Sequence, residues 1–275
     1  MVIDCHCHAG RGDGFIGPWD TDAPLDLYFE RARAAGIAKT VVFSAFHSNY
    51  AVANRELART VKKHASRLIG FAFVHAARDA GRIAAIVDEA IREYGFAGIK
   101  LHRYDAPITR EVCDSARAQG IPVIYDVMGA VATVELFATQ YPDVNFIIPH
   151  LGSFSDDWRA QLAMIDHMER HPNVFADTSG VRRFDLLLEA SRRAGDKLVF
   201  GSDGPYLHPG LELAKVRELR LSPDIERGVM GGTLSGLLAP RERREPKPVA
   251  ITLDVPPARV VTLRSAPWEH EFPGD

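Results

Sequence analysis

The feature that most constrains the fold of this chain is a repeated alternation of short apolar, β-branched runs with longer segments of helical spacing. Eight such runs follow one another, at residues 2–7, 40–45, 68–74, 97–101, 122–126, 145–149, 174–177 and 198–201. Several of the helical segments between them, such as LDLYFERARAAG and FDLLLEASRRAG, end at a glycine that suits a helix C-cap. Eight strand-helix units predict an α/β fold, a closed (β/α)₈ TIM barrel.

An open, doubly wound sheet is the structural alternative to this barrel. Such a sheet usually carries a glycine-rich phosphate-binding turn after an early strand. The segment GRGDG after the first run lacks the GxGxxG spacing, so the barrel is favoured.

The alternation ends near residue 240 and divides the chain into two expected parts. Residues 1–240 form the barrel, and residues 241–275 form a C-terminal extension with two short alternating runs, VAITLDV and RVVTLRS, around a Pro-Pro turn. We expect a β-hairpin-like extension. It could serve as a packing or subunit-contact arm, or as a flap over the active site of a neighbouring copy.

Composition narrows the partners of the chain. Its 275 residues, 46% of them hydrophobic, can bury one large core, and the formal charge of −3 is spread without a basic stripe for nucleic acid. No apolar run approaches the ~20 residues of a membrane helix, and the first ten residues do not resemble a signal peptide. We therefore expect a cytoplasmic protein that acts on a small molecule, forms a homodimer and keeps Cys5, Cys7 and Cys113 as reduced thiols.

Two histidines at the end of the first strand are the first candidates for chemistry. Because a strand alternates sides, Asp4, His6 and His8 are expected on one face and Cys5 and Cys7 on the other, towards the helices. Active sites of such barrels lie at the carboxyl ends of the strands. Two neutral imidazoles there predict a metal site.

Polar groups also follow several other strands. They are Lys100 and His102 after the fourth, Asp126 after the fifth, His150 after the sixth and Asp203 after the eighth. A titratable group at the end of an apolar strand is costly unless it is paired, hydrated or bound to a metal. Their recurrence therefore predicts one polar site at a common end of the barrel.

At these residues the chain resembles the amidohydrolase superfamily, in its amidohydrolase-2 branch, which includes aminocarboxymuconate-semialdehyde decarboxylase and many small-molecule hydrolases. The matching segments are IDCHCH, GIKLH, FIIPHLG, GSDGP and the closing segment ERGVMGGTLSGLLAP. They run in family order from residue 3 to about 240. The resemblance implies that His6 and His8 bind a divalent metal, that Asp203 is a further ligand that also handles a proton, and that His150 is a ligand or the general base.

One departure from the family pattern concerns the metal. The fifth strand usually ends in a histidine ligand, whereas IPVIYD places Asp126 there. We expect Asp126 to bind the ion or to pair with Lys100. Zinc is the expected ion, and the additional oxygen donor also allows manganese or iron. Lys100, His102 and His47 are candidates for a second ion or for contacts with substrate.

Three functions compete at this stage. The leading one is hydrolysis of a small organic molecule by a metal-activated water, with Asp203 or His150 handling the proton. The second is non-oxidative decarboxylation of a small carboxylic acid, for which Arg103 or Arg182 could hold the carboxylate. The third is an iron-dependent oxygenase that uses the same histidines and carboxylates.

Overall fold

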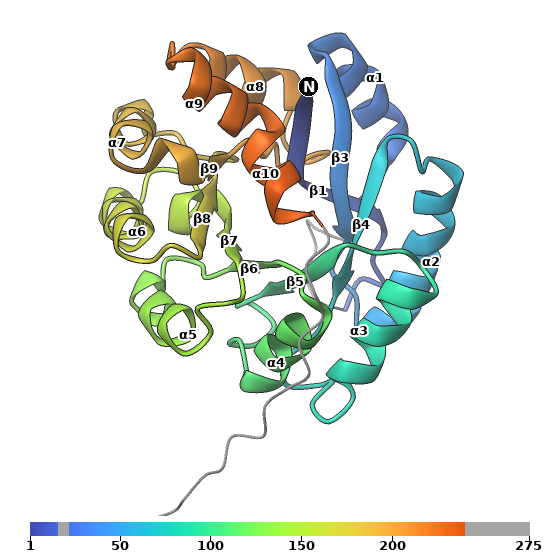
Figure 1. Cartoon of the computed structure of the whole chain (residues 1–275). Helices are drawn as coiled ribbons and strands as arrows, with labels where there is room; N and C mark the ends of the chain where they lie inside the picture. The colour runs from blue at the N-terminus through green and yellow to red at the C-terminus, as the bar shows by residue number, and fades with distance from the viewer. Residues whose placement is uncertain (16–21, 240–275) are drawn as a thin grey trace, which may run out of the picture.

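The computed structural model describes residues 1–15 and 22–239, and a ring of eight parallel strands forms its centre (Figure 1). The C-terminal extension, with its expected β-hairpin, lies outside the described residues. The parallel strands are β1 Val2–Arg11, β3 Ile37–Ser44, β4 Leu68–Phe73, β5 Gly98–His102, β6 Val123–Asp126, β7 Phe146–Ile148, β8 Val174–Asp177 and β9 Leu198–Val199. A two-residue strand, β2 Asp22–Ala23, pairs antiparallel with the end of β1.

Helices surround this ring on its outer side (Figure 1). They are α1 Leu25–Ala35, α2 Tyr50–Lys63, α3 Ile83–Arg92, α4 Arg110–Gln119, α5 Val134–Gln140, α6 Trp158–Arg170, α7 Phe184–Ala194, α8 Pro209–Arg217, α9 Pro223–Arg227 and α10 Thr233–Leu237. The expected glycine C-caps are present after α1 and α4, where Gly36 and Gly120 have φ values of 82° and 66°. After α7 the chain instead continues into a 3₁₀ turn, and Gly195 keeps a right-handed conformation. None of the described helices has the length and apolar character needed to cross a bilayer.

Backbone contacts between the first and last strands close the ring. The N–H of Cys5 donates to the carbonyl of Phe200 at 2.9 Å, and the N–H of His8 donates to that of Gly204 at 2.6 Å. Cys7 and Gly204 also form a parallel bridge. The predicted α/β barrel is therefore confirmed.

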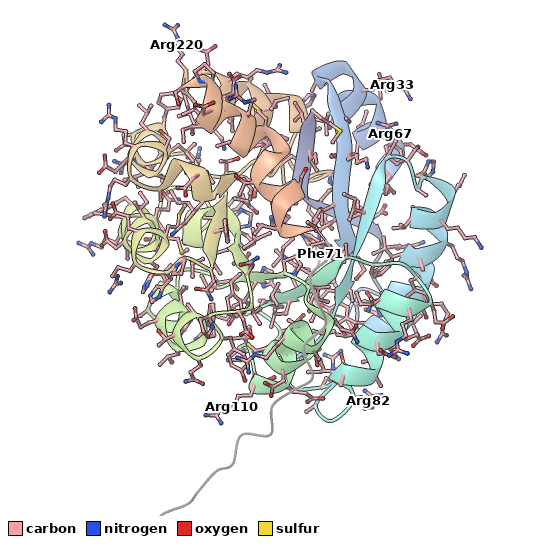
Figure 2. The ribbon with its side chains drawn as sticks, viewed as in Figure 1. Arg33, Arg67, Phe71, Arg82, Arg110 and Arg220 are labelled. Carbon is pink, nitrogen blue, oxygen red and sulfur yellow. The ribbon has the colours of Figure 1, made fainter. Side chains whose placement is uncertain are left out.

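The interior of the ring is filled with apolar side chains. Phe71 lies at the centre of the ring of strands, whereas Arg82, Arg110 and Arg220 project from the outer edge of the helical layer (Figure 2). The ring of Phe71 packs against Gly98, where a Cβ atom would lie only 2.3 Å from it. At the amino-terminal end, Leu234 and Leu237 of α10 join this inner cluster and cover it. The polar site must therefore lie at the opposite end of the barrel.

The first strand departs from simple alternation. Its pairing with β3 shifts register between Asp4 and Cys7. As a result Cys5 lies in the inner cluster, Cys7 lies in the layer between strands and helices, and Asp4 accepts a hydrogen bond from Tyr28 of α1. The expectation that both thiols face the helices and that Asp4 shares a face with His6 is therefore wrong, because a bulge inserts an extra residue and reverses the alternation.

Candidate active site

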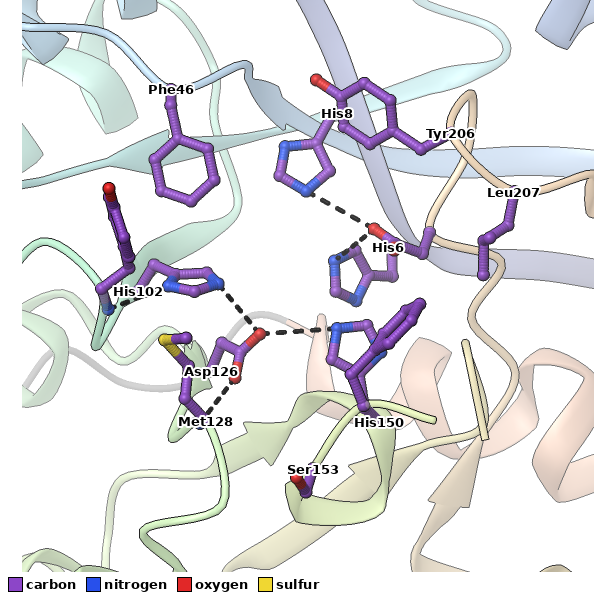
Figure 3. A pocket seen from close by; sticks show the side chains of 13 residues that line it. His6, His8, Phe46, His102, Asp126, Met128, His150, Ser153, Tyr206 and Leu207 are labelled. Atoms are coloured by element: carbon purple, nitrogen blue, oxygen red, sulfur yellow. Dashed lines mark hydrogen bonds and ion pairs between the residues drawn. The ribbon is translucent and has the colours of Figure 1, made fainter. Parts of the chain in front are cut away.

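A cavity of about 450 Å³ opens at the carboxyl ends of the strands (Figure 3). Its polar lining comes from different strand ends: His6 and His8 from β1, His102 from β5, Asp126 from β6, His150 after β7 and Asp203 after β9. Its other walls are apolar or aromatic, formed mainly by Phe46, Tyr104, Met128, Phe154, Tyr206 and Leu207. The cavity is within the size range of small-molecule sites.

Three potential ligand atoms converge within the cavity. Nε2 of His6 lies 3.3 Å and Nε2 of His8 lies 3.5 Å from Oδ1 of Asp203. A tetrahedral zinc ion with bonds of ~2.1 Å would separate its ligand atoms by about 3.4 Å. The spacing and the donor types, two imidazoles and a carboxylate, therefore fit a divalent metal ion.

A buried carboxylate at the end of β8, Asp177, contacts both His6 and His150. Nδ1 of His6 lies 2.7 Å from Oδ2 of Asp177, so its N–H donates there and leaves Nε2 free to bind an ion. The other oxygen of Asp177 accepts hydrogen bonds from the N–H groups of His150 and Ser179 and from the Ser179 hydroxyl. Asp177 could also be grouped with His6 and His150 as a metal site. Because its oxygens are already bonded in this way, it orients the imidazole of His6 and holds the backbone of His150, whose Nδ1 lies 2.9 Å from the carbonyl oxygen of Ser179.

Asp126 connects two further histidines (Figure 3). Its Oδ2 lies 3.0 Å from Nε2 of His102 and 3.4 Å from Nε2 of His150, and its Oδ1 accepts the N–H of Met128. Nδ1 of His102 accepts the N–H of Tyr104, so the neutral ring carries its proton on Nε2 and donates it to Asp126. In this arrangement His102 has no lone pair on Nε2 for an ion.

Burial keeps the two histidines of β1 neutral. It lowers the pKa of His6 to about 4, helped by the charge of Lys100, and it lowers the pKa of His8 well below its usual value, helped by His6. A neutral imidazole is the form that binds metal ions. Both residues are therefore ready to bind an ion at neutral pH.

Asp203 and His150 have pKa values displaced in the other direction. Burial raises the pKa of Asp203 to about 7, against the opposing charges of His150 and Lys100. Burial alone would lower the pKa of His150, but its hydrogen bond to Asp126 and the charge of that carboxylate raise it to about 9. For Asp126 itself burial acts upward, yet His102 and His150 hold its pKa well below the usual range. At neutral pH the site combines a carboxylate near its titration point with a protonated imidazole.

Asp203 and His150 also share an unusual backbone conformation. His150 and Asp203 have φ values of 59° and 55°, in the left-handed region that residues other than glycine seldom adopt. Such conformations cluster at functional sites, where the surrounding structure holds them. Here they turn each side chain from a strand end into the cavity.

Two of the predicted candidates lie away from the cavity lining. Lys100 is buried, and its Nζ lies 4.5 Å from the centroid of the Phe43 ring. This nitrogen has no hydrogen-bond partner among the described residues, and burial lowers the pKa of Lys100. The expected pair between Lys100 and Asp126 is not formed, because histidines and a backbone N–H occupy the Asp126 oxygens. His47 lies in the loop after β3, where its Nδ1 is 3.4 Å from Oδ2 of Asp13.

Asp177 and Ser179 contact the candidate site histidines, and the sequence reasoning missed both. Asp177 ends the strand run VFAD, so a search for polar groups at strand ends that included the seventh run would have found it. Ser179 offers no comparable signal, since its role depends on the turn after β8. Arg103 and Arg182, the candidate carboxylate clamps, do not line the cavity.

Comparison with solved structures identifies similar folds. The matches include an uncharacterised TIM-barrel protein from Bordetella bronchiseptica, with 18% identity, 86% of this chain and 98% of that chain covered, and a TM-score of 0.69. A dihydroxybenzoic acid decarboxylase from Polaromonas sp., with manganese and the inhibitor 2-nitroresorcinol bound, has 16% identity, coverage of 86% and 96%, and a TM-score of 0.65. A putative 2-pyrone-4,6-dicarboxylic acid hydrolase from Pseudomonas putida has 17% identity, coverage of 86% and 97%, and a TM-score of 0.66. At these identities the likeness establishes the fold.

A family model identifies the chain more specifically. No curated protein sequence matches the chain significantly. The model described as amidohydrolase, however, matches residues 3–233, which include the histidines of β1 and Asp203. This is most of the chain, and the chain therefore belongs to the amidohydrolase family.

Proposed function

We propose that this protein is a metal-dependent hydrolase of a small organic molecule with a flat apolar part. The observation that carries this proposal is the convergence of Nε2 of His6 and Nε2 of His8 on Oδ1 of Asp203, at 3.3 and 3.5 Å. This group lies in a cavity whose other walls are largely aromatic. The group of two imidazoles and a carboxylate suits metal-dependent hydrolysis, and the aromatic walls suit the flat apolar part of the substrate.

His6, His8 and Asp203 would hold the ion. We propose zinc, because two imidazoles and one carboxylate form a common set at catalytic zinc sites. Manganese is the alternative, supported by the manganese bound to the structurally similar decarboxylase and by the second carboxylate, Asp126, beside the site. When bound, such an ion supplies Lewis acidity and lowers the pKa of water towards ~7.

Asp203 is the proposed general base. Its carboxylate lies within the proposed ion-binding group, where a proton can be transferred to it, and in the ion-free protein burial raises its pKa to about 7. His150 is the proposed acid, because its contact with Asp126 raises its pKa and so keeps the imidazole protonated. The imidazolium of His150 would polarise the reacting carbonyl or protonate the leaving group. Tyr104, Met128 and Phe154, each about half exposed at the cavity, would hold the apolar part of the substrate and exclude water.

Decarboxylation is the second candidate, and the state of His150 favours it. A protonated imidazole directed into the cavity is the donor that a carbon needs after it loses carbon dioxide. No arginine or lysine side chain lines the cavity within residues 1–15 and 22–239. A substrate carboxylate would therefore lie at the end of the cavity that holds the proposed metal ligands, and it would also contact His150.

An oxygenase with two irons is less well supported. A second ion would need ligands beyond His6, His8 and Asp203, and the nearest candidates are His102, Asp126 and His150. These three residues already form a hydrogen-bonded chain through Oδ2 of Asp126. The arrangement suits proton handling better than a second ion.

Isotope labelling distinguishes the two leading reactions. The metal-loaded protein is incubated with a panel of aromatic esters, lactones and amides and with a panel of hydroxylated aromatic acids. In H₂¹⁸O, hydrolysis places ¹⁸O in the acid product; in D₂O, decarboxylation releases carbon dioxide and places deuterium on the ring carbon. We expect ¹⁸O incorporation that disappears in Asp203→Asn. Carbon dioxide release with ring deuteration, lost in His150→Asn, would instead establish the lyase.

A further inference from the structure

A second group of potential metal ligands lies in the outer helical layer, away from the cavity. Glu135 is in the first turn of α5, His167 is near the end of α6, and His171 directly follows α6. One ligand atom of each lies within 4.8 Å of the others. None of the three lines the cavity, and α5 and α6 are neighbours in the outer layer (Figure 1).

The distances suit a tetrahedral ion. Oε2 of Glu135 lies 3.0 Å from Nε2 of His171 and 3.6 Å from Nδ1 of His167. Ligand atoms around a zinc ion with bonds of ~2.1 Å would be about 3.4 Å apart. His171 directly follows α6, and its ring stacks on that of His167 with the centroids 5.8 Å apart.

The protonation of the group is suited to metal binding. Arg170 has only donors, and its Nη2 lies 3.2 Å from Nδ1 of His167, so this nitrogen is unprotonated and its lone pair, which accepts from Arg170, becomes available to an ion once Arg170 turns away. The carbonyl end of α6 also favours a positive charge nearby.

From this geometry we infer that Glu135, His167 and His171 form a second metal site, of the zinc class, that joins α5 to α6. His167 and His171 are largely buried, with 7% and 12% of their side chains exposed, whereas Glu135 is 47% exposed. The partly open side leaves a fourth position for water. The site lies on a different part of the barrel from His6 and His8, so it has a structural rather than a catalytic role.

Arg170 is the residue that opposes the ion. Its Nη1 lies 3.6 Å from Oε2 of Glu135, so that its charge competes with a cation for the carboxylate. Its side chain is 58% exposed and can turn into solvent when an ion binds. We therefore expect substitutions to change the metal affinity in opposite directions. Removing the Glu135 or His171 side chain should weaken metal binding, and removing that of Arg170 should strengthen it.

Calorimetric titration with ZnCl₂ alone tests this inference. A His6→Ala/His8→Ala background removes the cavity site and should retain one zinc per chain. In that background, Glu135→Gln and His171→Gln should each weaken binding at least ~10-fold, the loss that even indirect ligand contacts produce. Arg170→Ala should tighten binding. Glu189→Gln is the matched control, because this glutamate is similarly exposed on α7 and pairs with an arginine outside the site.

A second measurement covers the case in which the background fails to fold. Wild-type protein should bind one more zinc than the single variant Glu135→Gln, whose exposed side chain is not required by the core, and the two should have equal activity. The inference is overturned if neither the background nor the wild type shows this additional ion. It is also overturned if Glu135→Gln and His171→Gln bind zinc as tightly as their parent.

Discussion

At the scale of single residues, Asp126 is where the contacts in the structure differ most from the sequence-based expectation. The sequence alone suggests a metal ligand or a partner for Lys100; the structure shows no pair with Lys100 and brings Asp126 to His102 and His150, and its role as a ligand stays a prediction. No periodicity could predict this, because the contacts depend on side-chain directions at three separate strand ends. The position at a strand end was predictable, whereas the partner was not.

The role of Asp126 is testable through the pH profile. Asp126→Asn keeps the hydrogen bond from Met128 but removes the charge that raises the pKa of His150 to about 9. Burial then dominates, so the imidazole loses its proton at lower pH, and the alkaline limb of kcat should shift downward. We expect kcat at pH 8 to fall by ~10²-fold, with metal content retained. Loss of the metal with an unchanged pH profile would show that Asp126 is a ligand.

Asp203 provides a second residue-scale prediction, in the metal-free protein. Its pKa rises from 3.8 to about 7 on folding, so between these pH values the folded chain keeps a proton that the unfolded chain releases. Stability of the wild type should therefore fall, relative to Asp203→Asn, as pH rises from 4 to 7. The difference should reach about 4 kcal/mol at most.

Urea unfolding of both chelator-treated proteins across this pH range measures that difference. Asn is a suitable replacement because it tolerates the positive φ of this position. A difference that stays constant from pH 4 to pH 7 would show that Asp203 titrates normally in the folded protein.

At the scale of elements, the sequence predicted the strands well and their side-chain directions less well. Each of the eight apolar runs corresponds to a strand, because short β-branched runs between helical segments have few alternatives in this fold. The bulge in β1 was not predictable, since it depends on how β1 pairs with β3 and not on its own residues. The bulge turns the side chain of Cys5 into the inner cluster, while those of His6 and His8 still line the cavity.

Gly98 tests the packing of the inner cluster. A Cβ at this position would lie 2.3 Å from the ring of Phe71, which is fully buried at the centre of the barrel. Gly98→Ala should therefore lower the free energy of unfolding by about 1–3 kcal/mol. Gly236→Ala is the control, since nothing lies within 4 Å of its Cβ position in α10, and it should be neutral or slightly stabilising. Equal effects of the two substitutions in urea unfolding would contradict this account of the core.

At the scale of the whole molecule, the barrel brings together residues that are separated by most of the chain. His6 and Asp203 meet because the last strand closes on the first, and the two backbone hydrogen bonds of that closure lie beside the site. The common end of the strands could be predicted from the topology. The aromatic walls could not, because they come from loops whose paths no residue pattern specifies. The homodimer and the cytoplasmic location stay predictions.

The central claim is that His6, His8 and Asp203 hold the metal ion on which activity depends. The most direct test is elemental analysis of protein purified without added metal, in a Glu135→Gln background so that an ion on the outer helices is not counted. We predict one equivalent of a divalent transition ion, either zinc or manganese, and its loss together with all activity in His6→Ala/His8→Ala, while the circular dichroism spectrum is unchanged. A full equivalent of metal in that folded variant, or activity without any metal in the parent, would contradict the account.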